Sequence, residues 1–360
     1  MKGNIQGKEI YALILLVVGS HLADTTPAIL AQSGKNAFWQ MPVVAFVVML
    51  PSLLVLLYLL KKYEDKNLVT LIKTILGKYV GGFIVILLCL LVFAELFSYS
   101  RTTIDEMNKM YFPNSPIIVM YGILIFICIV GARKGFENIA NTAWIVVPYI
   151  KISVFLLAIL VMHEAIWNRI FPIWGDGLWV LVVEGAKKGS LFADVFLVAI
   201  AYNQMKSRKS FVGATVFGSF TALIEVTFFF LVYSVVFDYK SIDNVSSPFH
   251  EMTRYVSFGT FVTNLETFFM FFWLFTMMIR YVFLLYIVAW IFGELFKIKD
   301  FEPLLIPIGF LAVVVGIVPH DSIENTLIVR DYIMNGMTLF YFILPFLLWS
   351  VSKIKGDLST

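Results

Sequence analysis

Ionisable side chains occur at a few isolated positions inside long apolar runs of this 360-residue chain. Glu95, Asp194 and Arg280 lie in the runs AELFSYSR, LFADVF and WLFTMMIR, and Lys151 follows Pro148 in a fourth. A charge buried in apolar surroundings is costly unless it is paired or hydrated, so each is a candidate for function. An arginine can hold a carboxylate through two parallel hydrogen bonds, and a carboxylate can hold an ammonium. These residue types are therefore suited to binding a small charged molecule.

The composition indicates what surrounds these charges. The chain is 60% hydrophobic and 16% aromatic, and only 14% of its residues are charged, whereas soluble chains are about 25% charged. Apolar runs near the roughly 20 residues that span a bilayer recur from end to end. The sequence thus predicts an all-α polytopic membrane protein in contact with membrane lipid. The net charge of +3 gives no reason to expect a nucleic-acid partner.

We expect ten membrane-spanning helices within one transmembrane domain, 1–360. The eighth apolar run is too long for one perpendicular crossing at about 1.5 Å per residue, so it must tilt, break or project beyond the membrane. Between the second and third spans, Asn67–Lys78 has apolar residues at helical spacing, which predicts a helix at the membrane surface. The spans lie near Ile10–Ala31, Met41–Leu60, Val80–Ser100, Pro116–Ala132, Ile139–Met162, Leu178–Met205, Phe211–Phe237, Phe261–Phe296, Leu304–Val318 and Thr326–Val351.

The first and sixth spans are interrupted. The first contains VVGSHLADTTPAIL, with Gly19 and Pro27, and the sixth contains EGAKKGSLFADVF, with Gly185 and Gly189. Irregular backbone survives at membrane depth only inside protein or beside a water-filled cavity. Interruptions at matching positions of two halves indicate a transporter-type binding site. We therefore expect two inverted repeats of five helices, about 8–163 and 176–353, with discontinuous helices 1 and 6; a kinked structural helix is the alternative for either span alone.

The distribution of lysine and arginine indicates the orientation. With both termini on the cytoplasmic side, most of the basic residues outside the spans fall on the inner side, as membrane proteins prefer. Lys187, Lys188 and Arg330 are then assigned to outer segments, unless Lys187 and Lys188 sit at a helix break.

Four segments, in this order and spacing, resemble the B subunits of spore germinant receptors. They are GSHLADTTPAIL, LVTLIKTILGKYVGGFI, RTTIDEMNKMYFPNSP and NLETFFMFFWLFTMM. These B subunits form the endospore germination permease family of the amino acid–polyamine–organocation transporter superfamily. The resemblance implies a nutrient sensor in the spore inner membrane, next to an A-type subunit and a C-type lipoprotein subunit. It also implies that a small germinant, such as an amino acid, binds between broken helices 1 and 6 and triggers germination.

Aligned with that family, Glu95, Asp194 and Arg280 fall at pocket-facing positions. We expect Arg280 to be the charge centre of a ligand site, with Glu95 or Asp194 binding a ligand ammonium or holding Arg280 when the site is empty. Backbone donors at the first break, around Gly19, Ser20 and His21, offer a second anchor for an anion. The alternatives are a structural ion pair between Arg280 and one carboxylate, and a His21 that only fills space with a hydrogen bond.

Lys151 keeps a second function open. Some proton-coupled members of the superfamily carry a lysine of the fifth helix near the position that sodium occupies in others. By that resemblance, Lys151 would couple ions or protons, with Glu225 or Asp24 as its partner, in a proton- or cation-coupled amino acid permease. A structural pair with Glu225 or Asp24 is the alternative.

The sequence lacks motifs for other chemistry. No pair of the 4 histidines has metal-ligand spacing, and no nucleophile–base pair, phosphate loop or haem motif is present. The sequence therefore predicts neither an enzyme nor a metal or cofactor site.

Overall fold

The structure, a computed structural model, describes residues 4–243, 247–256, 265–318 and 329–356. Within these ranges the elements are helical, apart from an isolated bridge between Ile5 and Met205. Two shorter apolar helices, Ile117–Ala132 and Glu302–Ile317, accompany six stretches long and apolar enough to cross a membrane. The prediction of an all-α, multi-pass membrane protein is confirmed. The six stretches are Thr26–Lys62, Lys78–Met110, Phe136–Glu164, Arg208–Val236, Leu265–Phe296 and Arg330–Ile354.

The first apolar run is broken where its sequence predicts. Helix α1, Gly7–Gly19, gives way to a short 3-10 turn, η1, Ser20–Leu22, and the chain resumes as α2, Thr26–Gly34. Pro27 lies in the first turn of α2, where its missing N–H has no helical partner to lose. The residues between the two half-helices are buried, so the irregular backbone is shielded by protein.

The sixth run is broken as well. Helix α8, Leu178–Lys187, is followed by a 3-10 turn, η5, Gly189–Phe192, and by the short helix α9, Ala193–Leu197. A further 3-10 stretch, η6, Val198–Gln204, completes the run. Helix α9 packs against α1, so the two interrupted segments meet inside the molecule.

The remaining helices surround these two segments. Asn67 caps α4, since its side chain accepts a hydrogen bond from the Thr70 N–H at 2.9 Å, and the helix predicted within Asn67–Lys78 is present. The elements are η2 (Lys35–Gln40), α3 (Met41–Lys62), α4 (Leu68–Leu76), α5 (Lys78–Met110), α6 (Ile117–Ala132), α7 (Phe136–Val161), η3 (Met162–Glu164), η4 (Trp167–Ile170), α10 (Arg208–Val236), α11 (Tyr239–Asp243), α12 (Pro248–Tyr255), α13 (Leu265–Phe296), η7 (Glu302–Leu304), α14 (Leu305–Ile317) and α16 (Arg330–Ile354).

The long eighth run does not break within the described residues. Helix α13 is continuous for 32 residues, about 48 Å at 1.5 Å per residue. It therefore tilts or projects beyond an apolar layer of about 30 Å. The predicted starts of the eighth and tenth spans, Phe261 and Thr326, lie outside the described residues.

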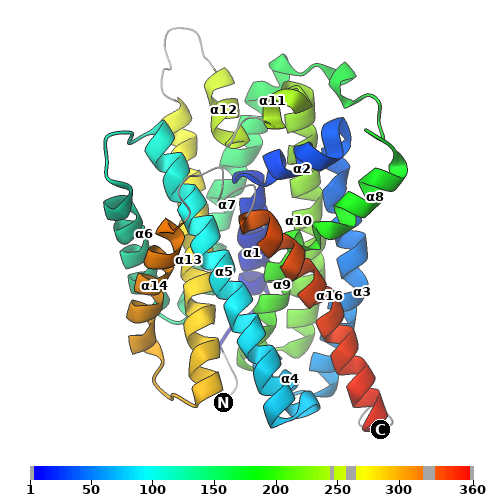
Figure 1. Ribbon diagram of the computed structural model, residues 1–360, viewed down its shortest axis with the longest axis vertical. Coiled ribbons are helices and arrows are strands. Elements are labelled where there is room, and N and C mark those ends of the chain that lie inside the picture. Colours follow the sequence, from blue (N-terminus) through cyan, green and yellow to red (C-terminus); the bar gives the residue numbers. More distant parts are fainter. Residues whose placement is uncertain (1–3, 244–246, 257–264, 319–328, 357–360) are drawn as a thin grey trace.

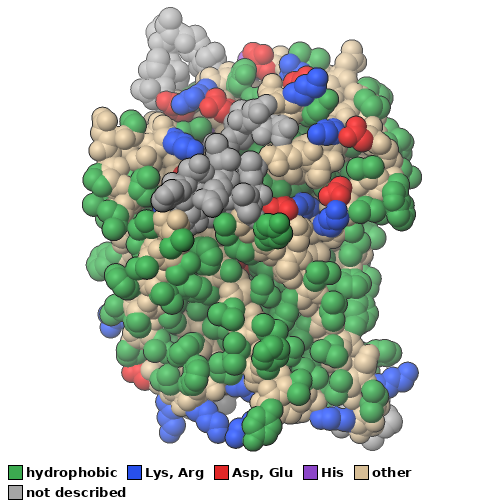
Figure 2. All heavy atoms as spheres, viewed as in Figure 1, with side chains coloured by type: hydrophobic (Ala, Val, Ile, Leu, Met, Phe, Trp, Pro, Cys, Tyr) green, Lys and Arg blue, Asp and Glu red, His purple; other side chains and the backbone are tan. Residues whose placement is uncertain are grey.

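The helices form one bundle with α1 at its centre, and both chain ends lie at the same end of it (Figure 1). Helix α1 is buried along nearly its whole length, between α7, α10 and α13. Apolar side chains dominate the middle of the face in Figure 2, and lysines and arginines lie at both ends, with aspartates and glutamates beside them at the upper end. This distribution suits a bundle with an apolar layer around its waist.

Candidate functional site: a buried charge network at the helix breaks

Arg280, halfway along α13, joins both broken segments. Its side chain is 1% exposed. Its Nη1 donates to Ser20 Oγ at 2.8 Å, and its Nη2 donates to Glu95 Oε1 of α5 at 2.6 Å. Asp194 Oδ2, on α9, lies 3.1 Å from the same Nη2. The structure thus brings together Arg280, Glu95, Asp194 and Ser20, whereas their contact with a ligand stays a prediction.

His21 connects this arginine to the first break. Its Nε2 lies 3.2 Å from Arg280 Nη2, and because a guanidinium only donates hydrogen bonds, Nε2 must accept. The ring proton then sits on Nδ1, which lies 3.3 Å from Asp24 Oδ2 and 3.3 Å from Thr26 Oγ1. In this arrangement His21 is a neutral, hydrogen-bonded link of the network.

Arg330, the first residue of α16, is a second buried arginine that the sequence analysis placed wrongly. It is 0% exposed, and its Nη2 donates to Asp24 Oδ2 at 2.5 Å and to Thr26 Oγ1 at 2.7 Å. Its Nη1 bonds the Thr25 hydroxyl. The assignment to an outer loop is therefore wrong, because the buried carboxylate of Asp24 draws Arg330 inside. A signal was available: the position lies within the predicted tenth span.

Tyr99 holds the two arginines in one cluster. It lies one turn after Glu95 on α5 and is 3% exposed. Its ring centroid is 4.4 Å from Arg280 Cζ and 3.9 Å from Arg330 Cζ, within the range of cation–π attraction. Sequence reasoning missed Tyr99, although its spacing from Glu95 puts it on the same helix face.

The network is closed to solvent but not saturated with hydrogen bonds. Among the described residues, Glu95 Oε2 and both oxygens of Asp194 have no hydrogen-bond partner, and neither has Nε of Arg280. Most buried polar atoms in proteins are paired, so an unpaired set in one place calls for a reason. That these atoms meet a ligand stays a prediction.

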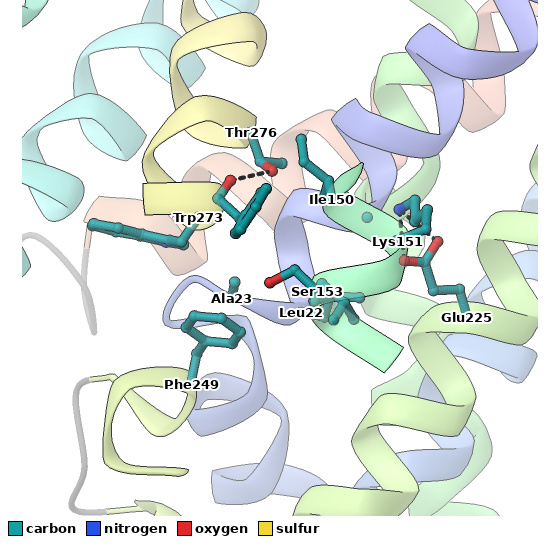
Figure 3. Close-up of a pocket in the computed structure, with 12 residues that line it drawn as sticks. Leu22, Ala23, Ile150, Lys151, Ser153, Glu225, Phe249, Trp273 and Thr276 are labelled. Atoms are coloured by element: carbon teal, nitrogen blue, oxygen red, sulfur yellow. Dashed lines mark hydrogen bonds and ion pairs between the residues drawn. The ribbon is translucent and has the colours of Figure 1, made fainter. Parts of the chain in front are cut away.

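Lys151 and Glu225 form a separate ion pair beside the first break, as Figure 3 shows. Lys151 Nζ of α7 lies 2.6 and 2.8 Å from the two carboxylate oxygens of Glu225 on α10, and 3.1 Å from Leu15 O. Of the two partners considered for Lys151, the structure places Glu225 next to it, whereas Asp24 bonds Arg330. A Cβ at position 19 would come within 2.8 Å of Nζ, so Gly19 makes room for the lysine.

A small cavity adjoins this pair (Figure 3). Its volume of about 20 Å³ is enough for one water molecule. Phe249 of α12 and Trp273 of α13 close it on the side away from Lys151. The remaining lining residues include Gly19, Leu22, Ala23, Ile150, Ser153 and Thr276.

The second break carries a further buried cation. Lys188, directly after α8, is 4% exposed and its Nζ bonds the Asp331 carboxylate at the start of α16. Lys187 beside it pairs with Glu184 at 2.6 Å. Both lysines therefore sit at the helix break rather than in an outer loop. In the described part of the chain, no group of three histidine, cysteine, aspartate or glutamate side chains is arranged to hold a metal ion.

Comparisons with known proteins agree on both family and fold. The chain is 25% identical over 313 residues to the putative spore germination protein YfkT of Bacillus subtilis, covering 86% of this chain and 85% of that one. It is 23% identical to spore germination protein A2 of Bacillus subtilis, covering 83% and 82% of the two chains.

Two solved transporters share its fold. A manganese transporter from Eremococcus coleocola matches with a TM-score of 0.58 at 13% identity, over 93% of this chain and 76% of that one. Mhp1, a nucleobase-cation-symport-1 family transporter solved in a closed conformation with bromovinylhydantoin bound, matches with a TM-score of 0.58 at 11% identity, over 94% and 75%. The family model described as spore germination protein matches residues 5–324, and the chain therefore belongs to the spore germination permease family, with a transporter-like membrane fold.

Proposed function

We propose that this protein is the nutrient-sensing subunit of a spore germinant receptor. It lies in the spore inner membrane with both termini on the cytoplasmic side, next to A-type and C-type subunits. Its helices form two inverted repeats of five, about 8–163 and 176–353, around discontinuous helices 1 and 6. A small germinant such as an amino acid binds at the charge network and triggers germination. Membership of the family and the transporter-like fold support this assignment.

The observation that carries the proposal is the meeting of both helix breaks at Arg280. Ser20 and Asp194 come from the two interrupted segments, and Glu95 comes from α5. Broken helices beside a transporter-type site are where substrates bind in related folds. A ligand carboxylate would replace one protein carboxylate on Arg280, and the released Glu95 or Asp194 would take the ligand ammonium. The ion pair seen here is then the resting state of the site.

The test is a germination assay on spores whose only receptor contains this chain, produced with its A-type and C-type partners. The spores are screened against the standard amino acids as Arg280→Lys and Arg280→Gln variants. We expect Arg280→Gln to abolish the response at normal protein level, and Arg280→Lys to raise the half-maximal germinant concentration at least tenfold, since lysine cannot form the bidentate contact.

Arg208→Gln is the matched control. Arg208 is a partly exposed arginine that pairs with Glu64 and Asp65, away from the network. Its replacement should leave the dose response unchanged. An unchanged response of Arg280→Gln, at normal receptor level, would remove Arg280 from the site.

The Lys151–Glu225 pair favours a second candidate, a proton- or cation-coupled amino acid permease. The pair is partly buried and adjoins the cavity at the first break, where a change of charge could be linked to movement of the half-helices. Uptake of labelled amino acid into proteoliposomes, driven by a proton or sodium gradient, would favour the permease. Binding of the amino acid without uptake would favour the sensor.

A further inference from the structure

The charge network holds more carboxylates than cations. The buried carboxylates of Asp24, Glu95 and Asp194 face the guanidinium groups of Arg280 and Arg330. His21 is neutral when its Nε2 accepts from Arg280, so the three carboxylates, when ionised, exceed the two guanidinium groups by one negative charge. The nearby lysines do not change this balance, because each has a carboxylate partner of its own, Lys151 with Glu225 and Lys188 with Asp331.

The unused hydrogen-bonding capacity is also mainly of acceptor type. Arg280 engages Glu95 through Oε1 and lies closest to Asp194 through Oδ2, which leaves Glu95 Oε2 and Asp194 Oδ1 free. Tyr341 of α16 is 0% exposed, and its hydroxyl likewise has no partner among the described residues. Its ring centroid lies 5.3 Å from that of Phe196, which is two residues after Asp194 on α9. Two carboxylate oxygens and a hydroxyl match the three donors of an ammonium group.

A fourth buried carboxylate has the same sign of charge. Glu106 lies three turns beyond Glu95 on the same face of α5 and is 3% exposed. Neither of its oxygens has a hydrogen-bond partner in the described part of the chain. Glu106 therefore adds another acidic side chain to the buried face of α5 that carries Glu95.

We infer that the site takes a ligand of net positive charge, a basic amino acid, whose ammonium sits between Glu95, Asp194 and the Tyr341 hydroxyl. This rests on the proposed function and adds the substrate class. The ligand carboxylate binds Arg280, and the extra positive charge compensates the extra carboxylate. A neutral amino acid leaves that carboxylate uncompensated, which is costly at membrane depth. Tyr341 thereby becomes a residue of the binding site.

Three amino acids of matched length separate charge from shape: L-lysine, L-norleucine and L-α-aminoadipate, with net charges of about +1, 0 and −1 at neutral pH. Binding is measured as thermal stabilisation of the purified full chain in detergent. We expect half-maximal stabilisation by lysine at a concentration at least tenfold below that of norleucine, with aminoadipate weakest. Cadaverine lacks the carboxylate and therefore distinguishes an amine ligand from an amino acid ligand. If cadaverine binds as tightly as lysine, the ligand is still cationic, but the inference that it is a basic amino acid is overturned.

Two isosteric variants test the location. Glu95→Gln and Asp194→Asn each remove the extra negative charge, and each should reduce the lysine preference to about threefold or less. Having both variants guards against the failure of one to fold. The inference is overturned if the wild-type chain binds norleucine as tightly as lysine, or binds none of the three amino acids. It is also overturned if the preference for lysine survives both substitutions. Germination by a neutral amino acid that still requires Arg280 would overturn it too, while leaving the proposed function intact.

Discussion

Removing Arg330 should destabilise the protein more than any exposed ion pair would. Arg330→Met keeps the apolar stem of the side chain but deletes the donors to Asp24 Oδ2, Thr25 and Thr26. Breaking a buried ion pair from one side costs about 3–5 kcal/mol. Asp24 would retain the Thr26 N–H at 2.7 Å, His21 at 3.3 Å and Arg280 at 3.8 Å. We therefore expect the low end, about 3 kcal/mol, or about 150-fold in the unfolding equilibrium.

The measurement is SDS-induced unfolding of the purified chain in mixed micelles. Asp24→Asn and the double variant Asp24→Asn/Arg330→Met complete a thermodynamic cycle. Because the double variant removes both members of the Asp24–Arg330 pair, it should be more stable than Arg330→Met alone, with a coupling energy of about 2 kcal/mol. A loss below about 1 kcal/mol for Arg330→Met, the range of exposed pairs, or strict additivity in the cycle would refute the reasoning.

Three further predictions concern residues around the network. Glu106→Gln should raise the free energy of unfolding by about 1 kcal/mol in SDS titration, because it removes a buried acidic group whose oxygens have no hydrogen-bond partner among the described residues; a loss of stability would contradict this. Gly19→Ala should lower the free energy of unfolding by about 1–2 kcal/mol, because the new Cβ meets Lys151 Nζ at 2.8 Å. In a chain that also carries Lys151→Met, the loss should be smaller. An equal loss with Lys151 and with Met at position 151 would argue against the contact. Burial, reinforced by Arg254, lowers the pKa of His250 to about 3. As the pH falls, the unfolded chain binds a proton on His250 before the folded chain does, so the free energy of unfolding decreases below about pH 6.5. Between pH 7 and pH 5, thermal melting should report a decrease of about 2 kcal/mol. The His250→Phe variant should not show this decrease.

The breaks and the lipid-facing helices could be predicted from sequence because their signals are local. Gly19 ends α1 and Pro27 begins the next half-helix within the same fourteen-residue segment, so backbone chemistry alone indicates the interruption. The meeting of Arg280 with Glu95 and Asp194 was also predictable, since charges isolated in apolar runs must find one another.

Residues whose role depends on distant partners were harder to place. Arg330 was counted with the outer loops because positive charge near a span end usually faces water, and only the fold brings it to Asp24, 306 positions earlier in the chain. Tyr99 and Tyr341 look like ordinary aromatic residues of membrane helices until two arginines and two carboxylates are placed beside them. The buried position of His250 likewise follows from α12 packing against α13, which no local pattern indicates.

The shared ring of Tyr99 links Arg280 to the start of α16. Both arginines contact the ring of Tyr99, and both approach Asp24, Arg330 at 2.5 Å and Arg280 at 3.8 Å. A ligand that moves Arg280 therefore also disturbs the contacts that hold the start of α16 to the first break. Intermediate arrangements would leave buried charges without partners. They are therefore sparsely populated relative to the arrangement seen here and to the one in which both arginines have moved. Under the proposed function, each protein molecule then behaves as an on-or-off element, and a graded response comes from the fraction of molecules that have switched.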